Sequence, residues 1–371
     1  MKNNSFLWAI LTISMVMIVL FFGLLPRKWP IANDLQYLSD QRGIRFQNTG
    51  IAYVDDLTTF RHSLPWPLTI EMAVTASIDR RGFSPLLVMH DGADRRQLAI
   101  WQYGTSLIVM NGDDYSNKQR RPRIVGKNVF IPQRTSYLTI TSGEQGTHLY
   151  VDGVLSAANS NWKLSIPIEG DPLRLVLGHS VYGKYGWAGD LHGLAISGEA
   201  ISGDVVRRRF DRWAAGHNFD FFEQESTMLL FTFGQKSASP FVDQSGKNNY
   251  LKIPQHMIVL QKTILASTWR PLNWNRAVVG DMVVNVVGFM PLGIVFYGFL
   301  QCFSGSSIKH KQLIAVALSM LLSFGIELAQ AWIPTRYSTL LDLILNTLGA
   351  WLGIVGWRLI GRAKGTRMHT D

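Results

Sequence analysis

The residues with the clearest chemical potential lie inside apolar segments near the C-terminus. The pattern D-x-x-x-N-x-x-G occurs twice, over 281–288 and 342–349, and a third apolar run between the two copies carries Glu327. Ionisable side chains are expensive inside a membrane, so they usually pair with each other or serve a function. Removed from water, the carboxyl groups of Glu327 and Asp342 would hold a proton more tightly, which makes each of them a candidate general acid or base.

Helical periodicity brings further polar side chains to the same faces. Residues at i, i+4 and i+7 share one face of a helix, so each of the three apolar runs presents one polar face. Arg336, in the short turn before the last run, is the expected counter-charge for Glu327 or Asp342. The candidate ligand-binding residues within the membrane are therefore Asp281, Asn285, Ser323, Glu327, Gln330, Arg336, Asp342 and Asn346.

This polar cluster has two interpretations, and the sequence leaves both open. In the first, the cluster binds the headgroup of an amphiphile at the outer membrane face, where Arg336 could hold a phosphate or carboxylate bidentately. In the second, the cluster is an interhelical hydrogen-bond network that only holds a small bundle together. Such contacts are individually modest, at ~0.6 kcal/mol each, and the number of polar groups favours the first interpretation. The apolar runs near the C-terminus hold no histidine, which gives a nucleophilic mechanism little support.

The elements that must position these residues are transmembrane helices. Predominantly apolar runs at 6–25, 282–300, 313–333 and 340–360 each have about the 20 residues that a membrane-spanning helix needs. The first run is longer than the apolar region of a signal peptide, and no small-x-small cleavage site follows it, so we expect an uncleaved anchor. The sequence from 33 to 276 is typical of a soluble domain. The chain therefore predicts a four-helix transmembrane bundle with one large domain outside it.

Basic residues near the apolar runs predict the orientation. The loop after the second run holds Lys309 and Lys311 with no acidic residue, and the C-terminal tail is also basic, whereas the turn around Arg336 has one basic residue. Because cytoplasmic loops carry the excess of Lys and Arg, both termini are expected in the cytoplasm and the soluble domain outside. Part of the net charge of +10 lies in this tail, which suits anionic lipid headgroups. The only cysteine is Cys302, so the exported domain has no disulfide, and no nucleic-acid-binding motif is present.

The sequence of the exported domain predicts an all-β sandwich. Short runs of alternating apolar and polar residues recur between turns, and Asp152-Gly153 is a strong signal for a two-residue hairpin. One helix is expected over 202–213, begun by a Ser or Asp cap. The predicted strands are 67–74, 97–102, 106–110, 137–141, 148–151, 174–178 and 191–196.

Several of these strands carry a resemblance to a known family. Thr69-Ile-Glu71, the run from His148 to Gly153, and the run from Trp187 to Ala195 resemble a laminin-G-like (concanavalin A-like) jelly-roll sandwich. The resemblance covers roughly 43–213, and it implies a glycan or another extracellular ligand as partner. Sequence around 231–251 resembles the opening strand and turn of such domains, and it could supply a final strand or a short stalk.

Aromatic side chains are the candidates for stacking on sugar rings in this domain. Trp101, Tyr103 and Tyr115 are the glycan-binding candidates, although an aromatic residue on a strand is more often part of the core. We expect no metal and no cofactor. The loop residues Asp91, Asp94, Asp113 and Asp114 could offer oxygen ligands to calcium, an alternative that the sequence leaves open, but their spacing matches no defined calcium loop, which favours solvated turns.

The polar cluster carries a second resemblance, to the VanZ-like family. It rests on Asp281, Asn285 and Phe289-Met-Pro-Leu-Gly293, then on Ser323, Glu327 and Gln330, and then on Arg336, Asp342, Asn346, Gly349 and Gly353. The resemblance implies an association with resistance to the glycopeptide teicoplanin. The expected location is the bacterial cell (inner) membrane, with the sandwich periplasmic or extracellular. The matched D-x-x-x-N-x-x-G copies would also fit a parallel repeat of two hairpins, with the sandwich inserted into the first.

These observations predict the following organisation and function. Residues 1–29 form an anchor, 30–220 the sandwich, 221–280 a final strand and stalk, 281–362 the three-span VanZ-like region and 363–371 a cytoplasmic tail. The expected function is to bind or modify a membrane lipid or lipid-linked envelope precursor while the sandwich binds an envelope polysaccharide. The alternative is a non-catalytic, membrane-anchored carbohydrate-binding or adhesion module. The sequence leaves open whether the protein is an enzyme and whether it forms a homo-oligomer.

Overall fold

The computed structural model contains two compact units, and each is described by itself. The helical unit comprises Met1–Trp29 and Lys262–Asp371, and the sandwich unit comprises Pro30–Gln261. The structure describes residues 2–25, 30–38, 42–57, 60, 66–78, 82–92, 97–112, 122–167, 170, 172–219, 222, 226–234, 240–262, 264–266, 276–303, 307–334, 336 and 338–367.

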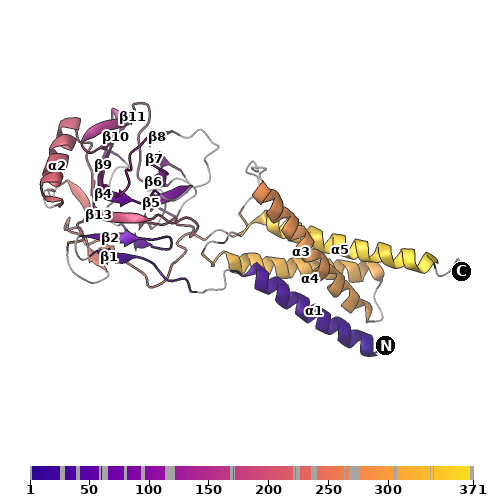
Figure 1. Ribbon diagram of the computed structural model, residues 1–371. Helices are drawn as coiled ribbons and strands as arrows, with labels where there is room; N and C mark the ends of the chain where they lie inside the picture. The colour runs from indigo at the N-terminus through magenta and orange to yellow at the C-terminus, as the bar shows by residue number, and fades with distance from the viewer. Residues whose placement is uncertain are drawn as a thin grey trace. The chain divides into compact units, whose positions relative to one another are not determined.

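The sandwich unit consists of two antiparallel sheets (Figure 1). In the described part of the chain the first sheet has eight strands, ordered β1-β2-β13-β4-β9-β10-β11, and β14 also pairs with β13. The second sheet has six strands, ordered β3-β12-β5-β6-β7-β8. The first sheet contains β1 (Gln36–Leu38), β2 (Gly43–Phe46), β4 (Leu68–Ala76), β9 (Ser136–Gly143), β10 (Gly146–Val151), β11 (Val154–Asn159), β13 (Gly189–Ser197) and β14 (Thr227–Phe231). The second contains β3 (Ala52–Val54), β5 (Phe83–His90), β6 (Leu98–Tyr103), β7 (Ser106–Asn111), β8 (Arg123–Gly126) and β12 (Arg174–Leu177), and a separate hairpin joins β15 (Phe241–Val242) to β16 (Tyr250–Leu251).

Alternation along the strands explains the core between the sheets. Successive side chains of a strand point to opposite faces, so Leu68, Ile70 and Met72 of β4 enter the core together. The second sheet contributes Leu98 and Ile100 of β6 to the same cluster. The predicted all-β sandwich is thereby confirmed, and every strand expected from alternation is present.

Several shorter strands and the eight-residue β5 were not predicted from the sequence, and for β5 the reason is physical. This strand is buried on both faces, because Leu87 and Met89 pack into the central core while Val88 packs into a second cluster with Ile51. A strand without a solvated face shows no polar–apolar alternation. A register shift between Pro85 and Leu87 further interrupts the pattern.

The hairpin between β10 and β11 turns where the sequence predicts it. Asp152 and Gly153 have φ angles of 51° and 75°, which are the positive values that a two-residue turn of this kind requires. The predicted helix is α2 (Gly203–Gly216), and Ser202 occupies its N-cap position, but the Ser202 side chain makes no capping hydrogen bond.

Helix α2 covers part of the outer face of the first sheet (Figure 1). Ala73, Tyr137 and Ala195 come from three strands of that sheet, and they pack with Trp213 of α2 and with Phe219. The same sheet receives β14, which pairs with β13 along Leu194–Ser197. Sequence beyond residue 220 therefore contributes a strand to the sandwich.

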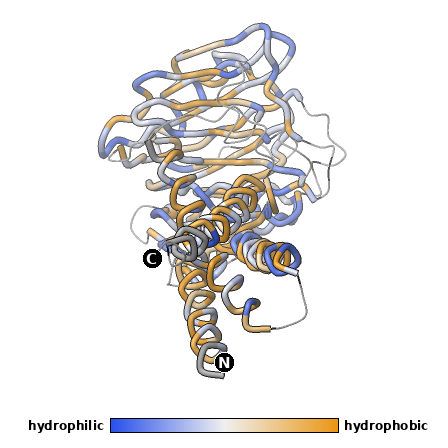
Figure 2. The backbone as a smooth tube through the Cα atoms, turned by 90° about the vertical axis from the view of Figure 1, so that its right-hand side faces the viewer, coloured by the Kyte–Doolittle hydropathy of each residue, from blue (hydrophilic) through white to orange (hydrophobic). Residues whose placement is uncertain are grey.

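The helical unit contains α1 (Lys2–Gly23), α3 (Arg276–Gln301), α4 (Ile308–Gln330) and α5 (Leu340–Arg367). In the described residues, four segments of these helices are long and apolar enough to cross a membrane: Ser5–Gly23, Val279–Gln301, Ile308–Gln330 and Leu340–Gly361. Figure 2 shows hydrophobic residues along almost the whole length of α1. Helix α1 packs against α3 and α4, where Val19 contacts a cluster of Phe289, Leu292 and Ile326.

Candidate functional site

Glycines place α3 and α5 in direct backbone contact. A Cβ atom added to Gly293 would lie 2.1 Å from the carbonyl oxygen of Ala350, and one added to Gly349 would lie 2.1 Å from that of Val286. Gly353 has the same relation to Met290, at 2.2 Å. Small residues permit this close approach of helices in a membrane.

The close contact lets short polar side chains reach across the α3–α5 interface. Asn285 Nδ2 of α3 donates to Asp342 Oδ1 of α5 at 2.6 Å. Asp342 also stands in the first turn of α5, where its backbone N–H donates to Thr339 Oγ1 at 3.0 Å. This is half of a capping box, and a carboxylate in the first turn interacts favourably with the helix dipole.

Glu327 connects α4 to the start of α5. Its Oε2 atom accepts a hydrogen bond of 2.8 Å from the backbone N–H of Thr339, and the side chain is buried. The carboxylate therefore satisfies one of the N–H groups that the start of α5 leaves without an intrahelical partner. Glu327 and Asp342 thus both contact Thr339, one through its backbone and one through its hydroxyl.

A second connection between α4 and α5 lies one helical turn further along both helices. Asn346 Nδ2 donates to Ser323 Oγ at 2.9 Å, and both residues are buried. The Oδ1 atom of Asn346 is buried and makes no hydrogen bond within the described chain. Ser323, Glu327, Asp342 and Asn346 are therefore brought together as helical periodicity predicts.

Gln330 and Arg336 contact α1 rather than the carboxylates. Gln330 Nε2 and Arg336 Nη2 donate to the carbonyl oxygen of Gly23, at 2.6 and 3.3 Å. Arg336 makes no ion pair with Glu327 or Asp342 among the described residues, but its positive charge acts on both carboxyl groups at longer range, so the expected counter-charge is present without a direct contact. The C-terminal end of a helix carries partial negative charge, which is an alternative partner for the guanidinium group. Arg336 Nε is buried and has no hydrogen-bond partner in the described chain.

Two members of the first D-x-x-x-N-x-x-G copy stay outside this network. Asp281 is exposed near the beginning of α3. A Cβ atom added to Gly288 would meet nothing within 4 Å, whereas one at Gly349, the equivalent position of the second copy, would meet a backbone oxygen. The two copies share one sequence pattern but differ in the packing around their residues.

The aromatic candidates in the sandwich unit differ in accessibility. Trp101 is only 1% exposed and packs with Ala99 and Ile108, so a sugar could not stack on its ring without displacing these neighbours. Tyr103 is 51% exposed and lies 4.8 Å from Phe83, measured between ring centroids. Tyr115 lies outside the described residues.

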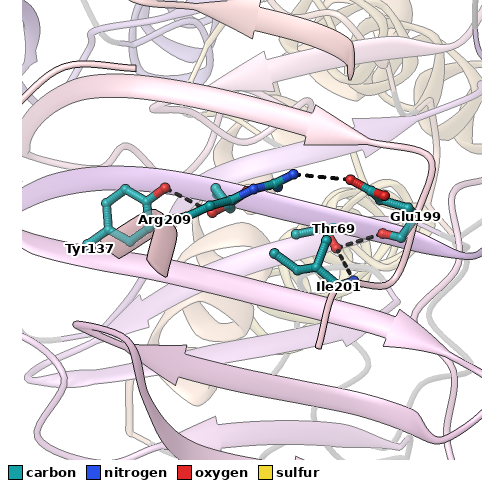
Figure 3. Close-up of polar contacts among 6 residues, drawn as sticks. Thr69, Tyr137, Glu199, Ile201 and Arg209 are labelled. Atoms are coloured by element: carbon teal, nitrogen blue, oxygen red, sulfur yellow. Dashed lines mark hydrogen bonds and ion pairs between the residues drawn. The ribbon is translucent and has the colours of Figure 1, made fainter. Parts of the chain in front are cut away.

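A buried ion pair fastens α2 to the first sheet, and the sequence did not reveal it. Glu71 is 1% exposed, and its Oε2 atom accepts from Arg209 Nη1 at 2.6 Å while its Oε1 atom accepts from the Tyr137 hydroxyl at 2.9 Å. Figure 3 shows Tyr137 and Arg209 of this cluster, together with Glu199. Arg209 also donates to Glu199 at 3.1 Å. Burial raises the pKa of Glu71 above its ordinary value, although the charge of Arg209 opposes that effect. Burial, and then the neighbouring carboxylate, also raises the pKa of Tyr137 well above its ordinary value.

The polar network in the helical unit lies within a region that a known family model matches. The VanZ/LLP1 family model matches residues 226–361. This range contains β14, the β15–β16 hairpin and helices α3 to α5, and it includes all the polar residues predicted within the membrane. The chain thus combines a VanZ-like membrane region with a β-sandwich.

Solved structures resemble the sandwich in fold only. Ruminococcus gnavus IT-sialidase CBM40 bound to α2,3-sialyllactose matches 48% of this chain and 98% of its own, at 11% identity and a TM-score of 0.38. Trypanosoma rangeli sialidase matches 45% and 27%, at 14% identity and a TM-score of 0.35. The NanB sialidase from Streptococcus pneumoniae matches 42% and 26%, at 13% identity and a TM-score of 0.34. Comparison with curated proteins gave no match. The laminin-G-like assignment stays a prediction.

One residue of the VanZ-like network escaped sequence analysis although a signal for it was present. Thr339 precedes an apolar run and stands three residues before Asp342, which is the spacing of a capping box. The contact between Glu327 and the backbone of Thr339 had no such signal, because it joins the end of one helix to the start of the next.

Proposed function

We propose that this protein is a cell-envelope membrane protein in which the VanZ-like bundle binds the polar headgroup of a lipid or lipid-linked envelope precursor, while the sandwich binds an envelope glycan. The basic residues flanking the apolar helices support an orientation with both termini in the cytoplasm and the sandwich outside. The phenotype expected from loss of the headgroup site is altered teicoplanin susceptibility, as the VanZ-like resemblance implies.

The observation that carries this proposal is the unfilled hydrogen-bonding capacity of the cluster. Buried polar atoms almost always have partners, so each exception calls for an explanation such as an absent ligand. Among the residues that the structure describes, Arg336 Nε is a donor without an acceptor and Asn346 Oδ1 is an acceptor without a donor. A guanidinium group suits the planar, bidentate recognition of a phosphate or carboxylate. A headgroup that combines such an anion with hydroxyl or amide donors would match both atoms.

Glu327 and Asp342 are the groups that could act on such a headgroup. Glu327 of α4 and Asp342 of α5 both contact Thr339 at the start of α5, so a ligand held by Arg336, which is close to Thr339 in the sequence, would lie near both carboxyl groups. A carboxyl group within reach of a bound headgroup is one of the side-chain types that general acid–base catalysis uses.

Native mass spectrometry of the full-length protein in mild detergent tests the headgroup site. Arg336→Gln removes the guanidinium group, and Glu327→Gln removes a charge but keeps an acceptor for the Thr339 N–H. Arg358→Gln is the matched control, because Arg358 also joins two helices, through a 2.6 Å hydrogen bond to Gln312, but lies near the opposite end of α5. A lipid or lipid-linked sugar that is retained by the wild type and the control, and lost from Arg336→Gln, supports the proposal. An empty wild-type protein contradicts it.

A second candidate function has its own supporting observation. Asn285 with Asp342, and Ser323 with Asn346, are direct interhelical hydrogen bonds of 2.6 and 2.9 Å, so these groups already stabilise the bundle. The protein would then be a non-catalytic, membrane-anchored carbohydrate-binding module. It predicts that Glu327→Gln lowers the stability of the bundle without changing the mass of any retained ligand.

A further inference from the structure

A row of polar side chains crosses the first sheet beyond the part that α2 covers. In the register of the sheet, Asp190 of β13 lies between Arg45 of β2 and Thr75 of β4. Their neighbours Ile44, Val74 and Leu191 point into the core, so the row itself points to the outer face. Thr75 Oγ1 continues the row to the hydroxyl of Thr135 at 2.8 Å.

This row borders a cleft with an internal volume of about 470 Å³. Ligand pockets for small molecules span roughly 300–1,000 Å³, so the cleft has room for a small ligand. Ile78 and Pro132 provide apolar surface within it. The polar groups that line the cleft are Arg45, Thr75, Ser77, Gln133 and Asp190.

The Arg45–Asp190 pair is arranged for recognition. Arg45 Nε donates to Asp190 Oδ1 and Arg45 Nη2 donates to Asp190 Oδ2, both at 2.7 Å, which holds the guanidinium plane in one orientation. Nη1 of Arg45 makes no hydrogen bond within the described chain, and the Arg45 side chain is 46% exposed. The pair therefore presents oriented donors and acceptors to the cleft with no net charge.

We propose that this cleft is the glycan-binding site of the sandwich and that it takes one ring of a neutral, hydroxyl-rich sugar. The inference rests on the proposed function, in which the sandwich binds an envelope glycan. Sugar hydroxyls both donate and accept, so the guanidinium group, carboxylate, hydroxyls and amide of the cleft can all pair with them. Ile78 and Pro132 match the apolar C–H face of a sugar ring. An acidic sugar gains less, because the charge of Arg45 is already neutralised by Asp190 and the pair offers no net positive charge to a carboxylate.

A printed array of neutral, amino and acidic envelope oligosaccharides tests the inference. The full-length protein is applied in lipid nanodiscs, as wild type and as Arg45→Gln. The variant should bind neutral sugars about tenfold more weakly, since hydrogen bonds to charged groups are lost. Gln133→Gly is a second cleft variant with little risk to folding, because Gln133 is exposed and has a positive φ of 59° that glycine adopts readily. Arg174→Gln is the control, because it removes another Arg–Asp pair, the 3.4 Å pair with Asp55 outside the cleft.

The outcomes separate this inference from the proposed function. Neutral sugars that bind the wild type and Arg174→Gln, but bind both cleft variants weakly, support the inference. Neutral sugars that bind all four proteins equally overturn the cleft assignment and leave glycan binding in place. Binding of acidic sugars alone overturns the predicted sugar class. A wild-type protein that binds nothing on the array overturns the inference together with the glycan part of the proposed function.

Discussion

The two copies of D-x-x-x-N-x-x-G offer a matched pair of substitutions at equivalent glycines, Gly288 and Gly349. Judged from the sequence pattern alone, the two glycines should have the same role. In the structure, a Cβ atom at Gly349 would lie 2.1 Å from the carbonyl oxygen of Val286, whereas one at Gly288 would meet nothing within 4 Å. Gly349→Ala should therefore destabilise the bundle, and Gly288→Ala should not.

The expected magnitude follows from this contact. Ordinary van der Waals contact begins at 3.4 Å, so the added carbon at 2.1 Å must move away by 3.4 − 2.1 = 1.3 Å. The obstacle is backbone, so α3 and α5 must separate, which also stretches the 2.6 Å hydrogen bond between Asn285 and Asp342. Overpacking costs about 1–3 kcal/mol, and loss of an interhelical hydrogen bond adds roughly 0.6 kcal/mol. At Gly288, alanine should instead stabilise the helix by up to about 1 kcal/mol.

Thermal unfolding of the full-length protein in mild detergent, followed by the circular dichroism of the helices, measures the difference. Gly349→Ala should lower the midpoint clearly, and Gly288→Ala should leave it unchanged or raise it. Equal midpoints for the two variants would refute the assignment of Gly349, and not Gly288, to the α3–α5 contact.

Two further predictions concern the sandwich and the orientation. Arg209→Met leaves Glu71 buried without its ion-pair partner, and it should cost about 3–5 kcal/mol near neutral pH, as measured by urea unfolding followed by tryptophan fluorescence. Because burial raises the pKa of Glu71, the folded variant takes up a proton more readily than the unfolded chain. The stability of the variant should therefore recover as pH falls through the raised pKa towards the ordinary pKa of a glutamate. A loss of stability that does not change with pH would contradict this reasoning. Cys302 is the only cysteine and is expected on the cytoplasmic side, so a membrane-impermeant maleimide should not label the wild type in intact cells. The same reagent should label a double variant that carries Cys302→Ser and Ser160→Cys, because Ser160 is exposed on the sandwich. Labelling of Cys302 in the wild type would reverse the proposed orientation.

The local patterns were sufficient to predict the architecture. Four apolar runs of membrane-spanning length became α1, α3, α4 and α5, and alternating strands became the sandwich. These features are readable because burial imposes a period on each element, close to two in a strand and 3.6 in a helix. The failure at β5 has the same cause, since a strand with two buried faces has no alternation to read.

The sequence by itself determined which residues are polar within the membrane and which helix faces they share. The tertiary structure alone decided their partners: Glu327 with the backbone of Thr339, and Arg336 with Gly23 rather than with a carboxylate. It also joined Glu71 to Arg209, which lie 138 residues apart. Such pairings depend on how packed elements are rotated and offset along their axes. Contacts between elements, such as those of the glycines between α3 and α5, set this geometry. The periodicity within a single element contains no information about it.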